Sequence, residues 1–257
     1  MIDDRHLLDI CRHLFDEAVE GDEGSEQQLD AFTPELERIA LAGDSGAQDL
    51  LGGVALVLAE DETAAARWFA LSAAAGSPVG ARSLGHLYAQ GAGVPRDTAR
   101  ALELFRAAVA GGDASAKATL GRLARAGVAE LPAEETLGLL TEAAGAGIAE
   151  ASAELGDLLA EAGRPAEALA RWTEAAAAGH ERATVLAAEC YRDGVGTEAD
   201  PVRAVQHYLM LLDHHSGAGV PQALALARHL TDDQVREACR LAGRDDHARS
   251  ILDTVRD

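Results

Sequence analysis

Aromatic residues, basic residues and cysteines are all scarce in this 257-residue sequence. Only 4% of the residues are aromatic although 48% are hydrophobic, so the core must consist mainly of Ala, Leu and Val. Small side chains at this density favour closely packed helices, because Ala is the strongest helix former. Three scattered cysteines, Cys11, Cys190 and Cys239, form neither an even disulfide framework nor a C-x-x-C motif. This pattern predicts a protein of a reducing cytoplasm.

Positive charge is in short supply. The 43 acidic residues outnumber the 22 Lys and Arg residues, which gives a formal net charge of −21, and residues 1–60 alone carry 15 acids against 3 Arg, a net of −12. Phosphate backbones and anionic membranes repel such a surface, so we expect neither nucleic acid nor a membrane as partner. A basic protein or peptide would be steered toward it. The alternative is that the acidic charge only keeps an Ala-rich protein in solution.

Long apolar runs are absent as well. The longest apolar stretch, residues 50–59, is far shorter than the roughly 20 residues that cross a bilayer. The opening MIDDRHLLDICRHLF has acidic residues where a secretory signal has a basic region and an apolar run. Both observations support a cytoplasmic location.

Glycine, in contrast, recurs at regular intervals. The segments FALSAAAG (69–76), FRAAVAGG (105–112), LTEAAGAG (140–147) and WTEAAAAG (172–179) each place a large apolar residue seven positions before a Gly. The anchors are Phe69, Phe105, Leu140, Trp172 and then Tyr208, in steps of 36, 35, 32 and 36 residues. An "LG" pair occurs at 51–52, 84–85, 120–121 and 155–156, with Ala187-Ala188 in the fifth place. Two series in phase indicate five repeated units.

Each unit is predicted to form a helix, a turn, a second helix and a short link. The first helix carries the "LG" pair, and Gly within a helix costs roughly 1 kcal/mol relative to Ala, so we expect it where another helix comes close. Asp97 and the pair Asp200-Pro201 are typical starts of the second helix. The residues expected to end helices in the left-handed conformation are Gly76, Gly112, Gly147 and Gly179.

Gly91 and Gly93 are expected to shape the turn between paired helices. A phosphate-binding loop is the alternative for these glycines. That loop needs a preceding strand and a Lys-Ser/Thr pair after the glycines. Here a predicted helix precedes them, and Val94-Pro95-Arg96 follow, so the turn is favoured.

These units resemble the Sel-one-like repeat (SLR), a relative of the tetratricopeptide repeat (TPR), with the pattern A-x-x-x-L-G-x-x-Y-x-x-G-x-G-V-x-x-D-x-x-x-A-x-x-x-F. Residues 80–112 match it almost throughout and residues 183–217 match it well, whereas 148–179 has the short turn EAGRPAE of the tetratricopeptide form. The resemblance implies an all-α fold, a right-handed α-solenoid of stacked antiparallel helix pairs. We expect an acidic N-terminal helical region at 1–42, with a helix pair around the acidic break EGDEGSEQQLD (20–30), five repeats at 43–219, and C-terminal capping helices at 220–257.

Members of the resembled family act as adaptors and scaffolds. The resemblance therefore implies a non-catalytic scaffold that binds a protein or peptide on its concave face, with no cofactor. Two alternatives remain: a regulatory protein of bacterial signalling that responds to a peptide or ligand, and an enzyme with an unrecognised site. The oligomeric state stays open.

The first helix of each pair lines the concave face in this architecture. Counting from the "LG" pairs predicts the following partner-binding residues: Arg82, His86, Gln90, Arg122, Arg125, Glu150, Asp157, Glu161, Arg182, Glu189 and Arg192. The predicted groove is basic near 82–125 and acidic near 150–161, and it contains no line of exposed aromatic residues. An ordinary solvated helix face is the alternative explanation of these charges.

Two groups of residues suggest metal ligands. His6, Cys11 and His13 could approach one another on one helix but lack the fourth ligand that zinc takes. Asp213, His214 and His215 are adjacent, and adjacent helical residues do not face each other. No nucleophile motif such as G-x-S-x-G is present. We therefore expect neither a metal site nor a catalytic site.

Overall fold

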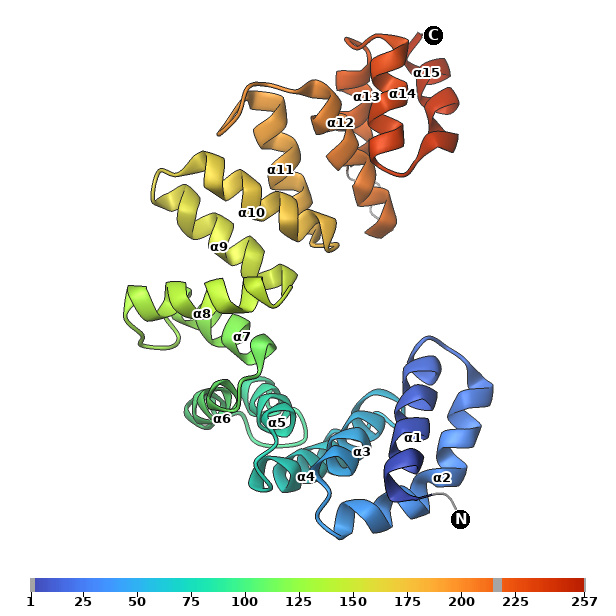
Figure 1. Ribbon diagram of the computed structural model, residues 1–257, viewed down its shortest axis with the longest axis vertical. Coiled ribbons are helices and arrows are strands. Elements are labelled where there is room, and N and C mark those ends of the chain that lie inside the picture. Colours follow the sequence, from blue (N-terminus) through green and yellow to red (C-terminus); the bar gives the residue numbers. More distant parts are fainter. Residues whose placement is uncertain (1–2, 215–218, 257) are drawn as a thin grey trace. The chain divides into compact units, whose positions relative to one another are not determined.

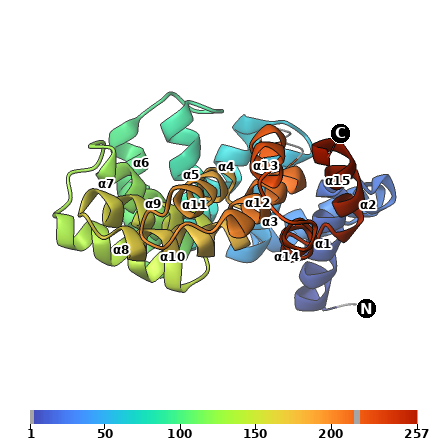
Figure 2. The ribbon, with the colours of Figure 1, turned by 90° about the horizontal axis from the view of Figure 1, so that it is seen from above.

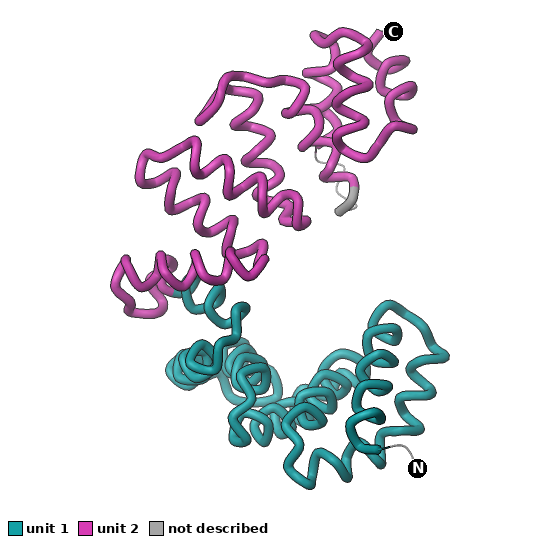
Figure 3. The backbone as a smooth tube through the Cα atoms, in the orientation of Figure 1, with its two compact units in different colours: residues 1–123 teal, residues 124–257 magenta. Residues whose placement is uncertain are grey.

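The computed structural model describes residues 3–214 and 219–256, and every regular element in these ranges is a helix (Figure 1). The expected all-α class is confirmed. The chain folds as two compact units, residues 1–123 and residues 124–257 (Figure 3). Helices that follow each other in a repeat pack side by side, as α5 and α6 do in both views (Figures 1 and 2).

Unit 1 consists of three helix pairs and most of a further helix. Within it α1 packs on α2, α3 on α4, and α5 on α6, while α4 packs in turn on α5 and so joins successive pairs. The bounds are α1 (Asp4–Val19), α2 (Glu23–Leu41), α3 (Ser45–Val57), α4 (Glu62–Ala74), α5 (Pro78–Gln90), α6 (Thr98–Ala110) and α7 (Ala114–Arg125), whose last residues belong to unit 2.

Unit 2 continues the same alternation and ends in three short helices. The bounds are α8 (Ala133–Gly145), α9 (Ala149–Glu161), α10 (Pro165–Ala177), α11 (Glu181–Asp193), α12 (Pro201–Met210), the 3-10 helix η1 (Leu211–His214), α13 (Val220–Ala227), α14 (Asp232–Leu241), the 3-10 helix η3 (Asp245–His247) and α15 (Ala248–Arg256). Both α13 and α14 pack on α12, and α15 packs on both of them. These helices lie in the region 220–257, and their role as a cap of the array stays a prediction.

The link between α1 and α2 is much shorter than the acidic segment 20–30. Only residues 20–22 lie between α1 and α2, and the rest of the segment belongs to α2. The Asp22 carboxylate caps α2 by accepting the Ser25 N–H at 2.8 Å. Glu23 and Glu26 then occupy the first turn, where negative charge interacts favourably with the helix dipole. The acidic residues therefore start a helix.

The "LG" pairs and the large anchor residues, which recur in two series along the sequence, contact each other in the structure. In three of the four "LG" pairs, the glycine lies under the large anchor residue of the next helix. A Cβ atom placed on Gly52, Gly85 or Gly156 would lie 2.5, 2.9 or 2.6 Å from a ring atom of Phe69, Phe105 or Trp172, respectively. The close approach expected from the sequence is confirmed, and the structure identifies the approaching group as an aromatic ring of the paired helix.

The expected helix ends and starts are also confirmed. Gly76, Gly112, Gly147 and Gly179 have φ angles of 90°, 87°, 85° and 85°. The Asp97 carboxylate accepts the Arg100 N–H at 2.9 Å and starts α6, and Asp200 caps α12 in the same way with Pro201 at its first position.

Gly93 and Gly196 are turn residues whose surroundings exclude a side chain. Their φ angles are 66° and 77°, and an added Cβ would lie 2.1 Å from the Glu62 carbonyl oxygen or 2.5 Å from that of Pro165, respectively. Both the glycines and the carbonyls are 103 residues apart (196 − 93 and 165 − 62). The two turns are therefore equivalent, and each approaches the first residues of a preceding helix.

Gly93→Ala is expected to lower the free energy of unfolding by more than about 2 kcal/mol, because it adds a clash with the backbone to the roughly 1–2 kcal/mol cost of a left-handed alanine. Gly112→Ala is the matched control, since its φ is 87° but no atom lies within 4 Å of the added Cβ. Urea unfolding followed by circular dichroism measures both. Equal losses for the two variants would contradict the close approach at Gly93.

Candidate functional site

The eleven residues predicted for partner binding lie on α5, α7, α9 and α11. Each of these is the first helix, or helix A, of its pair, and we call the eleven residues the helix-A strip. In unit 1 the Arg82 Nε atom donates to Asp113 Oδ2 at 3.2 Å. The His86 ring packs edge-on against Phe105, with ring centroids 4.9 Å apart. Burial, and then the nearby charges of Arg82 and Arg122, lower the pKa of His86. His86 is thus neutral near pH 7.

Four residues of the strip in unit 2 form one ion-pair network with Glu154. Arg125 uses all three guanidinium nitrogens: Nε donates to Glu154, Nη2 to Asp157 at 3.2 Å, and Nη1 to Glu161 at 3.1 Å. From α11, Arg182 donates to both carboxylate oxygens of Asp157, at 3.2 and 2.9 Å. We call these five residues the Arg125 network.

The Arg125 network largely neutralises itself. Three carboxylates face two guanidinium groups, which leaves a charge of −1. Burial works against the charge of Arg125, but the hydrogen bond to Glu154 and the charges of the three carboxylates raise its pKa. Arg125, expected to be part of a basic patch, is instead bound to the acidic residues of the next helix pair.

Sequence reasoning missed two members of this site. The Glu154 side chain is only 7% exposed and lies at the centre of the Arg125 network. Trp172, assigned to the core as a repeat anchor, also donates its indole N–H to Asp157 Oδ1 at 3.1 Å. The available signal was helical spacing, because residues 154, 157 and 161 share one face of α9.

The remaining strip residues of α11 surround another repeat anchor. Arg192 donates from Nη1 to the Tyr208 hydroxyl oxygen at 3.1 Å, and its other nitrogens pair with Asp193. Burial raises the pKa of Tyr208, while Arg192 acts in the opposite direction. Glu189 is half-buried on the same helix, and Gln90, at the end of α5, is exposed.

A second pattern links successive first helices. In three places the side chain that caps one first helix is bound by a residue of the preceding first helix, and we call each such pair a cap clamp. The three cap clamps are Asp49–Ser77 at 2.7 Å, Arg82–Asp113 at 3.2 Å and Glu150–His180 at 2.8 Å. Ser77, Asp113 and His180 accept the N–H of Gly80, Ala116 and Ala183, respectively. Arg82 and Glu150 of the helix-A strip therefore hold neighbouring helices in place.

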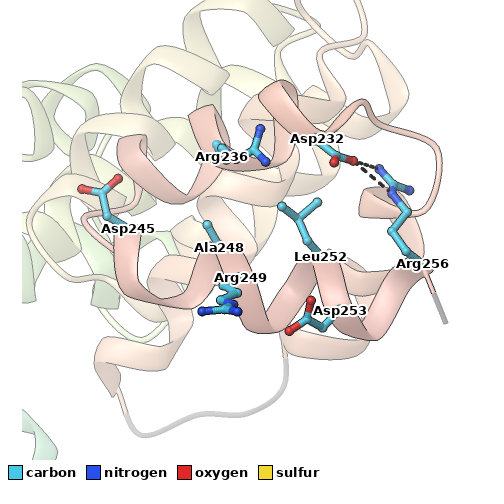
Figure 4. Close-up of a pocket in the computed structure, with 8 residues that line it drawn as sticks. All are labelled: Asp232, Arg236, Asp245, Ala248, Arg249, Leu252, Asp253 and Arg256. Carbon is cyan, nitrogen blue, oxygen red and sulfur yellow. Dashed lines mark hydrogen bonds and ion pairs between the residues drawn. The ribbon is translucent and has the colours of Figure 1, made fainter.

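A groove of about 680 Å³ lies between α14 and α15 (Figure 4). Its rim carries three aspartates and three arginines, so it favours neither an anion nor a cation. One of them, Arg256, is engaged by Asp232 at 3.1 Å and by the Leu230 carbonyl oxygen at 2.6 Å. The lining residues are Asp232, Arg236, Asp245, Ala248, Arg249, Leu252, Asp253 and Arg256.

The metal candidates of the sequence do not assemble in the part of the chain that the structure describes, where no group of three or more His, Cys, Asp and Glu is placed to hold an ion. Cys11 is fully buried in the core of unit 1. The side chains of residues 213–215 lie outside the described part. Across residues 3–214 and 219–256, no helix has the length and apolar character needed to cross a membrane.

Stacked antiparallel helix pairs with interlocking glycine and aromatic positions define a helical repeat protein. The Sel1 repeat family model matches residues 50–77, 78–113 and 183–213. Three segments of the chain therefore match the Sel1 repeat, and the helix pairs are arranged as in tetratricopeptide-like helical repeats. Proteins of this family are generally non-catalytic scaffolds for protein interaction. No curated protein matches the chain.

Two solved structures share this fold. A protective antigen of uropathogenic Escherichia coli strains, described as displaying an SLR fold, is 24% identical with a TM-score of 0.73. The match covers 95% of this chain but only 58% of the antigen. A Sel1 repeat protein from Oxalobacter formigenes is 22% identical with a TM-score of 0.62, and the match covers 84% of this chain and 88% of that one. The expected α-solenoid fold is thus confirmed.

Proposed function

We propose that this protein is a non-catalytic scaffold that binds a protein or peptide of basic character along the part of the helix-A strip that lies on α9 and α11 of unit 2. The observation that carries the proposal is the Arg125 network, which fixes charged side chains of α9 and α11 while leaving their outer parts accessible. The Glu161 side chain is 62% exposed and that of Arg182 is 50% exposed. Side chains already ordered in the free protein lose less conformational entropy when a partner binds.

The charge of the α9 and α11 part of the strip, four carboxylates against Arg182 and Arg192, supports a basic partner. The Arg125 network has a charge of −1, and Glu150 and Glu189 flank it on the same two helices. The chain as a whole carries −21, so long-range attraction acts in the same direction. A cytoplasmic location is part of the proposal, and it is supported by three cysteines that are all free and buried.

The test compares two charge reversals of equal size. The partner is first isolated on the full-length chain by cross-linking and mass spectrometry, and its affinity is then measured by calorimetry. Glu161→Lys with Glu189→Lys is expected to weaken binding, by roughly 0.2–1 kcal/mol for each contact, and the effect should shrink at high salt. Glu20→Lys with Glu23→Lys changes the net charge equally at the acidic N-terminal segment.

Loss of affinity confined to the N-terminal double variant would contradict the proposal and assign recognition to that segment. Equal losses in both variants would mean that only the net charge matters. A loss confined to the Glu161 and Glu189 variant supports the helix-A strip.

A further inference from the structure

The N-cap residue of α11 is a histidine, His180. The hydrogen bonds of its ring fit only the neutral form with the proton on Nε2. His180 Nδ1 accepts the Ala183 N–H at 3.2 Å, so this nitrogen carries no proton. The proton of the neutral ring must then be on Nε2, which donates to Glu150 Oε2 on α9 at 2.8 Å. The ring is only 16% exposed. Both nitrogens are therefore used, each by a different helix of unit 2.

We propose that protonation of His180 releases the first turn of α11 and at the same time tightens the bond to α9. In the imidazolium form both ring nitrogens are donors, so Nδ1–H would face the Ala183 N–H and the cap bond would be lost. A positive charge at the start of a helix is also unfavourable with the helix dipole. The bond to Glu150, in contrast, becomes a charge-assisted ion pair.

The other two cap clamps lack this property. Histidine changes its charge between about pH 5 and pH 8, whereas the aspartate and serine types that cap α7 and α5 do not. The equivalent pairs at Asp113 and Ser77 therefore keep their caps in this range. Acidification would act on one first helix of the array and leave its neighbours unchanged.

The charged side chains that the structure describes around His180 are few; η1 also packs on α11, and the side chains of its residues 213 and 214 lie outside the described part. Glu150 faces the ring from α9, and Glu181 and Arg182 follow it on α11, where Arg182 is bound to Asp157. From α10 the Ala175 carbonyl oxygen accepts the His180 N–H at 2.9 Å, and residues 175–179 carry no charge. Among the described side chains, Glu150 is thus the carboxylate that contacts the ring. Because α11 also carries Arg182, Glu189 and Arg192, the switch would act on the helix-A strip, but the inference does not depend on partner binding.

Hydrogen exchange of single amides in the full-length chain, followed by NMR, tests the proposal. We expect the protection factor of the Ala183 amide to fall about tenfold between about pH 7.5 and pH 5.5, the change that losing a typical N-cap produces. His180→Asn supplies a favourable N-cap acceptor that does not titrate, so protection should not change with pH in this variant. The Ala116 amide, capped by Asp113, is the control within the same molecule.

A second variant tests the tie to α9. Glu150→Gln keeps an acceptor for Nε2–H but removes the negative charge, so the release should move to lower pH. Identical pH courses at Ala183 in the wild type and in His180→Asn would overturn the proposal. Release at an unchanged pH in Glu150→Gln would overturn the part that assigns Glu150 as the stabilising partner.

Discussion

Phe105→Ala is expected to lower the free energy of unfolding by about 3–5 kcal/mol, the usual cost of removing a buried aromatic ring. Phe105 is 1% exposed and covers Gly85 of the same repeat. Gly85→Leu disrupts the same contact by overpacking it from the glycine side and should lower the free energy of unfolding by about 1–3 kcal/mol. Urea unfolding followed by circular dichroism measures both, with the exposed Val79→Ala on α5 as the surface control.

The double variant decides whether the glycine and the ring form one contact. With Phe105 reduced to alanine, a leucine at position 85 can enter the vacated space, so the two losses should not add. Strictly additive losses would show that the "LG" pair and the anchor act separately. A denaturation midpoint of Gly85→Leu equal to that of the wild type would refute the packing role of the glycine.

Arg125→Met is expected to lower the free energy of unfolding by about 1.5–3 kcal/mol, because it leaves the buried Glu154 carboxylate without its hydrogen-bond donor. Arg171→Met is the matched control, since Arg171 pairs with Glu174 one turn away on the exposed face of α10, and such a pair contributes roughly 0.3–0.5 kcal/mol. Thermal and urea unfolding provide the measurement.

A rescue variant separates the charge of Glu154 from the packing of Arg125. Glu154→Gln in the Arg125→Met background removes the unpaired charge while nearly keeping the volume, so stability should partly return. Equal losses for Arg125→Met and Arg171→Met would mean that the Arg125 network acts only as a set of surface ion pairs.

The repeat, its phase and the start and end of most helices could be predicted from the amino-acid sequence. Gly76, Gly112 and Asp97 could be assigned from local rules, because a left-handed φ angle and an N-cap depend on a few neighbouring residues. The spacing of the "LG" pairs and the large anchors identified buried positions for the same reason: a helix face follows from its period. The acidic segment 20–30 was misjudged as a break because its carboxylates suit the first turn of a helix.

Which charged side chains bind one another could not be predicted from the sequence, because it follows from the packing of successive helices. Residue counting placed Arg125 and Asp157 on one face as if each were available to a partner, but their pairing joins residues 32 positions apart on successive first helices. Glu154 and His180 gained their roles in the same way, through contacts 29 and 30 residues apart in the sequence. The spacing of hydrophobic residues indicates which face of a helix is buried. Ion pairing between helices depends instead on how one helix is rotated about its axis and shifted along it relative to the next. That relation is fixed by packing, chiefly by rings such as Trp172 lying on glycines such as Gly156.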